Sequence, residues 1–532
     1  MDTNTRAFLK ALQHPDFYPH PVSQIEMIET HISWVFLTGD WVYKIKKPVN
    51  LGFLDFSTLE KRYFYCQEEL RLNKRLAVDY YDSVVSITGS MQAPVLGGSG
   101  EVFEYAVKMR QFPQQSQLDR KLEKGQLTLA DMSRLAQKIA DFHQSIPQAG
   151  NDVAFGDLAH VHQPVTDCYQ TILNIISAKN DVQQVNQLQQ WSDDAFKQLQ
   201  TVFLQRKSSG FVRECHGDLH LRNIAIDDQQ VIVFDCIEFK ADFRWVDVMS
   251  EIAFLIMDLD DHGKTDLAYR FLNDYLEITG DYQGLVVLRY YLVYRAIVRA
   301  MVSAIRMGQG DLSKTEYDKE QKTFREYLQL AERYTHPKST ALLLTCGLSG
   351  SGKTYLAKSI APCIPAIHIR SDIERKRMFT HNHTQQKSSG IQQGIYKAEA
   401  TEKTYARLLE LAETLLNANF HVLIDATFLK KQQRQVFVEK AQTIGRPFLI
   451  LYAKATTEVM QQRILQRQAA NTDASDADLN VLQYQLKNQE ALTVDEMDYV
   501  LMVDTNDELN IDTVVSQIKA ELSQEETLPE MT

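Results

Sequence analysis

The sequence predicts a chain of two unlike parts, a mixed α+β part followed by an α/β part built on a parallel sheet. Its 532 residues exceed the usual size of one domain. The pattern of apolar residues also changes near Pro337: before it, strands give way to long helical stretches, and after it short apolar strands alternate with helices. Such alternation is typical of a parallel sheet with crossover helices.

The composition is that of a soluble globular protein. Hydrophobic residues make up 44% of the chain and charged residues 24%, which suffices for packed cores. The formal net charge of −12 disfavours broad binding to nucleic acid or to an anionic membrane. The six cysteines form no C-x-x-C pair, so we expect buried, reduced thiols. No apolar signal segment starts the chain, and arginines interrupt the most apolar helix candidate, 285–305. We therefore expect a cytoplasmic enzyme without a membrane span.

The first hundred or so residues read mainly as strands. A hairpin is predicted over 32–45, with Gly39 in its turn, because two β-rich runs flank a short polar segment. A charged helix is expected over 58–76 and a further strand over 102–109. The rest of this part is helical, apart from a strand–loop–strand segment between Phe211 and Phe239.

The second part begins after the polar, proline-bearing segment around Pro337. Four apolar strands are expected there, and a long helix over 395–417 lies between the second and the third; the strands span 342–346, 366–369, 422–424 and 448–452. We expect three domains in all: a small lobe, a helical lobe that carries a catalytic loop, and a phosphate-binding α/β domain, over 1–112, 113–335 and 336–532.

The segment GLSGSGKT, Gly347 to Thr354, fits the phosphate-binding pattern G-x-x-x-x-G-K-[ST]. A strand precedes it and a helix follows, which disfavours the alternative of a chance glycine-rich turn. Backbone N–H groups of such a loop face phosphates, and the helix N-terminus adds a favourable dipole. Lys353 is expected to reach the β- and γ-phosphates, and Thr354 to bind Mg²⁺. The rest of the cradle is expected from Gly347, Ser349, Gly350, Ser351 and Gly352.

Two carboxylates complete the predicted site of the second part. Asp425 ends an apolar strand, where a metal-holding aspartate belongs, although an aspartate there can also cap a helix. Asp372 follows the second strand and is expected to take the proton of an acceptor hydroxyl. Arg370 or Arg375 would hold an anionic group of the acceptor. The alternative is that Ser371 or Asp372 caps a helix.

Arg463 and Arg467 lie four residues apart on a helix, before the polar loop 471–476. We expect both to belong to a lid that closes over the transferring phosphoryl group, while a solvated basic helix face is the alternative. Together these motifs make residues 340–510 resemble the P-loop kinases, a group that includes gluconate kinase, chloramphenicol phosphotransferase, the zeta toxins and polynucleotide kinase 5′-domains. The motifs do not separate these substrate classes.

In the first part, the loop 215–223 contains the pattern H-x-D-x-x-x-x-N. Asp218 would orient or deprotonate the acceptor hydroxyl, and Asn223 would hold Mg²⁺. Asp235 ends the apolar strand that comes after this loop and is the expected second metal ligand. The combination is a stronger signal than the triplet HGD alone.

A strand lysine and a helix glutamate are also expected in the first part. Lys44 and Lys46 lie on the same face of the predicted strand, because side chains alternate between faces. We assign Lys44 to the nucleotide phosphates and Glu69 as its ion-pair partner. Glu68 stays an alternative, because one sequence does not fix the helix register.

Residues 20–310 resemble the aminoglycoside phosphotransferase and choline kinase-like superfamily. The likeness rests on the HGDxxxxN loop, the strand that ends in Asp235, the helix 135–143 and the segment 245–248. It implies a two-lobed kinase-like fold and a structural role for Asp247 as an anchor of the catalytic loop. Arg295 and Arg299 share a helix face, where snorkelling is favoured over binding an anionic substrate group. The whole arrangement resembles a bacterial family described only by its two domains.

The sequence thus predicts a bifunctional ATP- and Mg²⁺-dependent phosphotransferase that acts on small hydroxyl-bearing molecules at two separate sites. ATP is the expected nucleotide, with GTP left open at one site. In one alternative, one domain senses nucleotide and regulates the other. In another, the C-terminal domain phosphorylates a polynucleotide or a nucleotide sugar, which the acidic net charge disfavours for nucleic acid. No motif identifies the acceptors or the oligomeric state.

Overall fold

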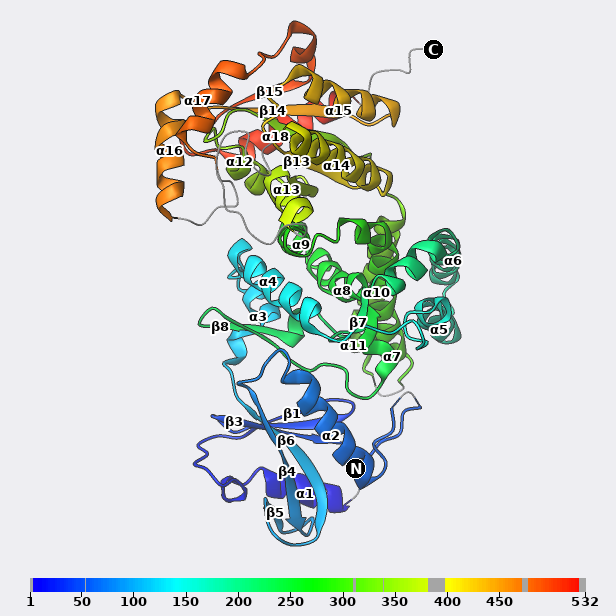
Figure 1. Ribbon diagram of the computed structural model, residues 1–532. Helices are drawn as coiled ribbons and strands as arrows, with labels where there is room; N and C mark the ends of the chain where they lie inside the picture. Colours follow the sequence, from blue (N-terminus) through cyan, green and yellow to red (C-terminus); the bar gives the residue numbers. More distant parts are fainter. Residues whose placement is uncertain are drawn as a thin grey trace. The chain divides into compact units, whose positions relative to one another are not determined.

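A computed structural model describes residues 3–52, 54–309, 312–337, 339–380, 398–470 and 477–525 (Figure 1). The chain divides into two compact units. The first unit comprises Met1–Ala178 and Ser192–Asp258, and the second comprises Lys179–Trp191 and Leu259–Thr532. The second unit therefore includes helices that precede Pro337 in the sequence. The three-domain division given above stays a prediction.

The first unit begins with α1 (Thr3–Leu12) and continues with a six-stranded antiparallel sheet of order β1-β2-β3-β6-β4-β5. The predicted hairpin is present in it, and Val35 on one strand lies opposite Lys44 on the other. Gly39 in its turn has φ 101°, a left-handed conformation that favours glycine. The strands are β1 (Glu26–Glu29), β2 (Ser33–Leu37), β3 (Trp41–Lys46), β4 (Tyr81–Gly89), β5 (Pro94–Leu96) and β6 (Val102–Arg110).

One helix of this unit packs against the sheet and carries residues of the site. This helix, α2 (Leu59–Asn73), contacts β4 and β6. It begins after Thr58, whose side chain accepts a hydrogen bond from the N–H of Lys61, as an N-cap residue does. Glu69 lies on α2 and is fully buried.

The remainder of the first unit is helical, with two short sheets. β7 (Val212–Glu214) pairs with β10 (Trp245–Asp247), and β8 (Ile224–Asp227) pairs with β9 (Gln230–Val233), in both cases antiparallel. The catalytic loop runs from the end of β7 to the start of β8, so both of its ends are fixed by strands. The surrounding helices are α3 (Leu118–Glu123), α4 (Leu129–Ser145), α5 (Leu158–Ile175), the C-terminal part of α6 (Lys179–Ser208) and most of α8 (Val248–Asp261).

The second unit contains the predicted parallel sheet (Figure 1). Its strand order is β12-β13-β11-β14-β15. All five residues of the central strand are buried, which is why it reads as an unbroken apolar run. Four strands match the predicted ones and β15 was not predicted. The strands are β11 (Leu342–Cys346), β12 (Ala366–Arg370), β13 (His421–Asp425), β14 (Phe448–Lys454) and β15 (Val500–Asp504).

Helices pack on this sheet around an apolar cluster. Leu343, Leu423 and Leu449 from three strands share the cluster with residues of α12 and α18, including Leu356 and Ile518. The helices after the phosphate-binding loop are α12 (Lys353–Ile360), α13 (Ser371–Thr380), α14 (Ala398–Asn417), α15 (Lys431–Thr443), α16 (Thr457–Ala470), α17 (Leu479–Asn488) and α18 (Ile511–Glu525).

Further helices of the second unit precede the sheet in the sequence, among them α9 (Thr265–Thr279), α10 (Leu285–Met307) and α11 (Lys314–Thr335). α10 and α11 pack along each other. Arg295 of α10 is buried. Arg299 of α10 donates a hydrogen bond to the hydroxyl of Tyr327 on α11, so Arg299 links the two helices. Among the described helices, none is long and apolar enough to cross a membrane.

Candidate active sites

The catalytic loop brings Asp218 and Asn223 together. The side-chain nitrogen of Asn223 donates to both the backbone and the carboxylate oxygen of Asp218, at 3.0 Å each. His220 Nε2 lies 3.2 Å from the same carboxylate. The Asp218 side chain keeps 34% of its surface exposed, so it is held from one side and reachable from the other. A carboxylate in this setting can orient or accept a hydroxyl proton.

Two strand lysines converge on one buried glutamate. Lys44 Nζ lies 2.9 Å from Glu69 Oε1, and Lys46 Nζ lies 2.6 Å from Glu69 Oε2. Lys44 also contacts Asp235 Oδ1 at 2.5 Å, and Lys46 pairs with Glu238. The strand that carries the lysines is thereby tied to the segment after β9 that carries Asp235.

The alternative partner, Glu68, points elsewhere. Its carboxylate accepts hydrogen bonds from Arg71, one turn further along α2, at 2.8 and 3.0 Å. The geometry therefore favours Glu69 as the partner of the strand lysines. Burial alone would raise the pKa of Glu69, but Lys44 and Lys46 lower it to about 2.

Three carboxylates surround the two strand lysines. Those of Glu69, Asp235 and Glu238 lie against the ammonium groups of Lys44 and Lys46. Burial on its own would lower the pKa of Lys44, but Asp235 and Glu69 hold it well above its usual value, so this lysine stays charged.

The donor atoms fit Mg²⁺. Asn223 uses its side-chain nitrogen on Asp218, which leaves the amide oxygen as the atom that would bind a metal. The N–H of Phe234 donates to the backbone oxygen of Asn223 at 3.0 Å, so Asn223 lies across from the residue before Asp235. An amide oxygen and a carboxylate are ligands that Mg²⁺ accepts.

Asp235 has an unusual backbone conformation, with φ 64°. Non-glycine residues with positive φ are uncommon and concentrate at functional sites, because the strain must be held by neighbours. Here the N–H of Asp235 donates to the Tyr81 hydroxyl at 3.3 Å. The next two N–H groups donate to Asn73 Oδ1 at 2.9 Å and to His216 O at 3.1 Å. The conformation is thus fixed from both sides of the site.

The catalytic loop is anchored by Glu251 of α8, which is fully buried. Its two carboxylate oxygens accept the N–H groups of His216 and Gly217, at 2.6 and 2.8 Å. Gly217 has φ 90°, and a Cβ there would lie 2.7 Å from the oxygen of Phe243, so this position needs glycine. The resemblance to the choline kinase-like superfamily implied this anchoring role for Asp247. In the structure Asp247 instead accepts hydrogen bonds from Arg206, at 2.7 and 2.8 Å.

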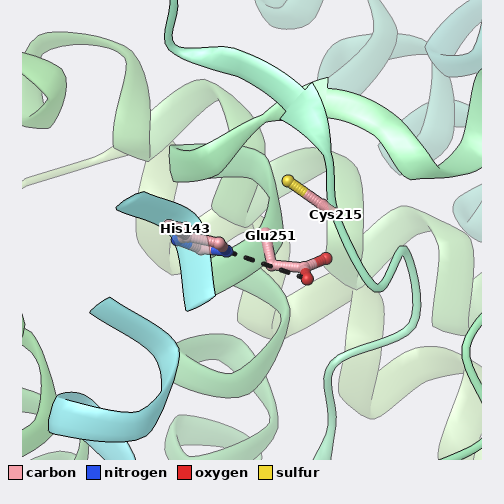
Figure 2. Close-up of side chains that lie close together, drawn as sticks. All are labelled: His143, Cys215 and Glu251. Atoms are coloured by element: carbon pink, nitrogen blue, oxygen red, sulfur yellow. Dashed lines mark ion pairs between the residues drawn. The ribbon is translucent and has the colours of Figure 1, made fainter. Parts of the chain in front are cut away.

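Glu251 also lies near His143 and Cys215, two residue types that bind metals (Figure 2). His143 Nε2 is 3.9 Å from a Glu251 oxygen. Both Glu251 oxygens already accept loop N–H groups, and burial raises the pKa of Cys215 well above its usual value, which keeps the thiol protonated. We therefore interpret this cluster as support for the catalytic loop.

The phosphate-binding loop of the second unit has the backbone that its glycines predict. Gly347 and Gly350 have φ 140° and 81°, and a Cβ on either would lie within 2.7 Å of a backbone oxygen, of Ala453 or of Met460. Lys353, the first residue of α12, donates to the oxygen of Leu348 at 2.7 Å across the loop. Burial lowers the pKa of Lys353.

Two buried polar atoms of this loop region have no hydrogen-bond partner among the described residues, Ser351 Oγ and Arg463 Nη1. A Cβ on Gly352 would lie 3.3 Å from Arg463 Nη1, so this guanidinium faces the start of α12. A buried donor without an acceptor is costly, and phosphate oxygens are the acceptors that guanidinium groups bind best. The donor set therefore fits a nucleotide phosphate.

The predicted lid is described only in part, because the loop 471–476 lies outside the described residues. Arg467 of α16 donates to the oxygen of Ala477 at 2.8 Å. Gln485 of α17 accepts the N–H of Ser349 at 2.8 Å, so the helix after the loop contacts the phosphate-binding loop directly. No motif in the sequence points to Gln485.

Asp425 ends β13 beside the phosphate-binding loop. It accepts a hydrogen bond from Thr345 at 3.1 Å, and His368 Nε2 lies 3.5 Å away. Burial would raise the pKa of Asp425, but His368, Lys353 and the hydroxyl of Thr354 lower it to about 2. An ionised carboxylate next to the Thr354 hydroxyl fits a Mg²⁺ site.

Asp372 and Arg370 lie where β12 passes into α13. Arg370 Nη2 donates to Asp372 Oδ2 at 2.9 Å, and Arg370 Nη1 donates to Glu277 of α9 at 3.2 Å. The other oxygen of Asp372 accepts the N–H of Ile373 at 3.0 Å. Arg370 thus lies between two carboxylates. Arg375 lies on α13.

Two family models match separate segments of the chain. Residues 110–288 match the phosphotransferase enzyme family, and residues 342–492 match an AAA domain. Uncharacterized proteins of Mycobacterium bovis and Mycobacterium tuberculosis are each 28% identical over 463 residues, which cover 86% of this chain and 89% of theirs.

Solved structures resemble each part separately. A Plasmodium vivax ethanolamine kinase is 11% identical, with a TM-score of 0.37, over 62% of this chain and 94% of its own. A gluconokinase from Sinorhizobium meliloti 1021 is 18% identical, with a TM-score of 0.25, over 35% of this chain and 94% of its own. With TM-scores below 0.5, neither structure adds to the family matches.

The family matches agree with the two resemblances found in the sequence. The chain joins two kinase-like segments, and it is an ATP-dependent kinase or phosphotransferase. Both families imply ATP, typically with Mg²⁺, and neither match supports GTP.

Proposed function

We propose that the chain is a bifunctional ATP- and Mg²⁺-dependent phosphotransferase that acts on small hydroxyl-bearing molecules at two separate sites. One observation supports the proposal: each unit holds a lysine and two carboxylates among its predicted site residues. The lysine would bind the phosphates, one carboxylate would hold the metal and the other would serve the acceptor. In the first unit they are Lys44, Asp235 and Asp218, and in the second unit Lys353, Asp425 and Asp372.

At the first site the residues would divide the work of phosphoryl transfer. Lys44, held by Glu69, would bind the nucleotide phosphates, and Asn223 and Asp235 would hold the metal. The acceptor hydroxyl oxygen would attack the γ-phosphorus while Asp218 accepts the hydroxyl proton. ADP would leave with the electron pair of the broken P–O bond. Mg²⁺ neutralises phosphate charge when it is bound.

At the second site the phosphates would lie in the loop around Lys353. The N–H groups at the start of α12 and the guanidinium of Arg463 would stabilise the charge of the transferring group. Thr354 and Asp425 would hold the metal, and Asp372 would take the acceptor proton. Small acceptors are favoured because the chain is acidic, with a formal net charge of −12.

The test uses the full chain, Mg²⁺, γ-labelled ATP and a cell metabolite extract. We expect Asp218→Ala and Lys353→Ala each to abolish a different set of labelled products, and the double variant to abolish all. If one single variant abolished every product, only one site would transfer phosphate. Efficient 5′-labelling of RNA or DNA oligonucleotides, lost in Lys353→Ala, would show that small acceptors are the wrong class for the second site.

A further inference from the structure

We propose that Glu277 of α9 is a positioning residue of the second active site, which it completes from outside the phosphate-binding segment. The proposal rests on the proposed role of Asp372 in that site. α9 falls within the residues that match the phosphotransferase family, 110–288, yet it belongs to the unit that contains the parallel sheet. Its contacts with that sheet are specific.

α9 covers the open edge of the sheet. β12 is an edge strand, so within the described part of the chain one side of its backbone has no neighbouring strand. Asn273 of α9 takes the place of a neighbouring strand there. Its side-chain nitrogen donates to Ala366 O, and its side-chain oxygen accepts the N–H of His368, at 2.9 Å each. One amide therefore makes both hydrogen bonds that a strand residue would make. This pair fixes α9 in register against β12.

Glu277 lies one turn further along α9, on the same face as Asn273. Its carboxylate accepts a hydrogen bond from Arg370 Nη1 at 3.2 Å, and Lys358 Nζ lies 3.7 Å away. The other terminal nitrogen of Arg370 donates to Asp372 at 2.9 Å. A continuous path of contacts thus runs from Glu277 through Arg370 to the carboxylate proposed to take the acceptor proton.

The end of α9 also holds the helix that carries Asp372. Arg377 of α13 donates to the backbone oxygen of Glu277 at 2.7 Å, in the last turn of α9, where a cation is favoured by the helix dipole. A Cβ on Gly280 would lie 2.5 Å from Arg377 Nε, so the chain leaves no spare room there. α9 therefore contacts β12 before Asp372 and α13 after it.

Arg370 stays charged between its two partners. Burial alone would lower the pKa of Arg370, but Asp372, Glu277 and Asp425 raise it. Without the Glu277 charge, this buried guanidinium would lose one of its carboxylate partners, and the Asp372 carboxylate would be drawn toward it. Displacement of a catalytic group by about 1 Å can cost up to about a hundredfold in rate.

The test is Glu277→Gln in the full chain, with Asp218→Ala added to silence the first site. The probes are Mg²⁺-ATP and the metabolite extract. We expect kcat for Lys353-dependent transfer to fall about tenfold or more, while KM for ATP changes less than about twofold. The matched control is Asp274→Asn on the same helix, whose carboxylate pairs with Arg270 at 2.7 Å. This control should keep the full rate.

A second variant separates positioning from folding. If Glu277 acts through Arg370, Glu277→Gln should cost little further rate in an Arg370→Gln chain, whereas two independent effects would multiply. Transfer by Glu277→Gln at the rate of Asp274→Asn would overturn the inference and leave the proposed function standing. Multiplying effects, or a raised KM with unchanged kcat, would also overturn it. If transfer in the Asp218→Ala chain did not depend on Lys353, the proposed function and the inference would both be wrong.

Discussion

Replacing Glu69 with glutamine removes one charge from the buried cluster that joins the two strand lysines to the site. Glu69 is fully buried, with Lys44 at 2.9 Å and Lys46 at 2.6 Å. After the change, both ammonium groups stay buried and lose the carboxylate that they share. We expect the first unit to lose about 3 kcal/mol of unfolding free energy at pH 7.

Two separate arguments give this magnitude. The pKa of Glu69 falls from 4.5 to about 2 in the folded chain, a difference that corresponds to about 3 kcal/mol. Breaking a buried ion pair by removing one partner typically costs about 3–5 kcal/mol. Because the folded pKa is lowered, the contribution is complete above about pH 4.5 and disappears as the pH falls toward 2. The difference between the wild type and the variant should shrink in the same range.

The assay is urea unfolding followed by tryptophan fluorescence. Trp34, Trp41 and Trp245 lie in the first unit and Trp191 lies in the second. The wild type and each variant therefore carry Trp191→Phe, so that the fluorescence reports on the first unit. The control is Glu68→Gln, which should cost less than about 1 kcal/mol, because its partner Arg71 is 47% exposed. The reasoning is refuted if Glu69→Gln costs no more than this control, or if its cost does not decline below about pH 4.5.

Four further substitutions test the sites directly. Asp235→Ala should weaken Mg²⁺-ATP binding by the first unit in calorimetry, whereas Asp218→Ala should remove transfer and keep that binding; the reverse pattern would exchange their roles. Gly217→Ala should lower stability in thermal unfolding by about 1–3 kcal/mol, because its φ of 90° and the Phe243 oxygen disfavour a Cβ, so an unchanged Tm would contradict the anchored loop. Arg463→Met should weaken ATP binding by the second unit about tenfold, and unaltered affinity would exclude a phosphate contact.

The sequence predicts best what is encoded locally. Residues 347–354 and 215–223 each hold their chemistry within nine positions, and their backbone follows from glycines and flanking strands. The parallel sheet could be predicted because strands buried on both faces give unbroken apolar runs, and the structure confirms it. β15 gives no such run, since only Val503 of its five residues is buried, and it was therefore missed. An edge strand of this kind leaves a weak apolar signal.

Residues that act through distant partners leave no such signal. Lys46 and Glu238 are 192 positions apart, and no period or motif links them. Period-two alternation offered Lys46 together with Lys44, but only the folded cluster shows that both share Glu69. Glu251 was missed as well, because a carboxylate that binds backbone N–H groups needs no particular sequence around its partners.

The pairing of Asn273 with β12 affects how the chain can be cut for expression. The polar segment around Pro337 invites a truncation there, and the resulting fragment would keep the whole phosphate-binding loop. It would also expose the peptide groups of Ala366 and His368 along a bare sheet edge, where another copy can add a strand. Such a fragment is prone to self-association and precipitation. A fragment that begins before Thr265 carries its own cover for that edge.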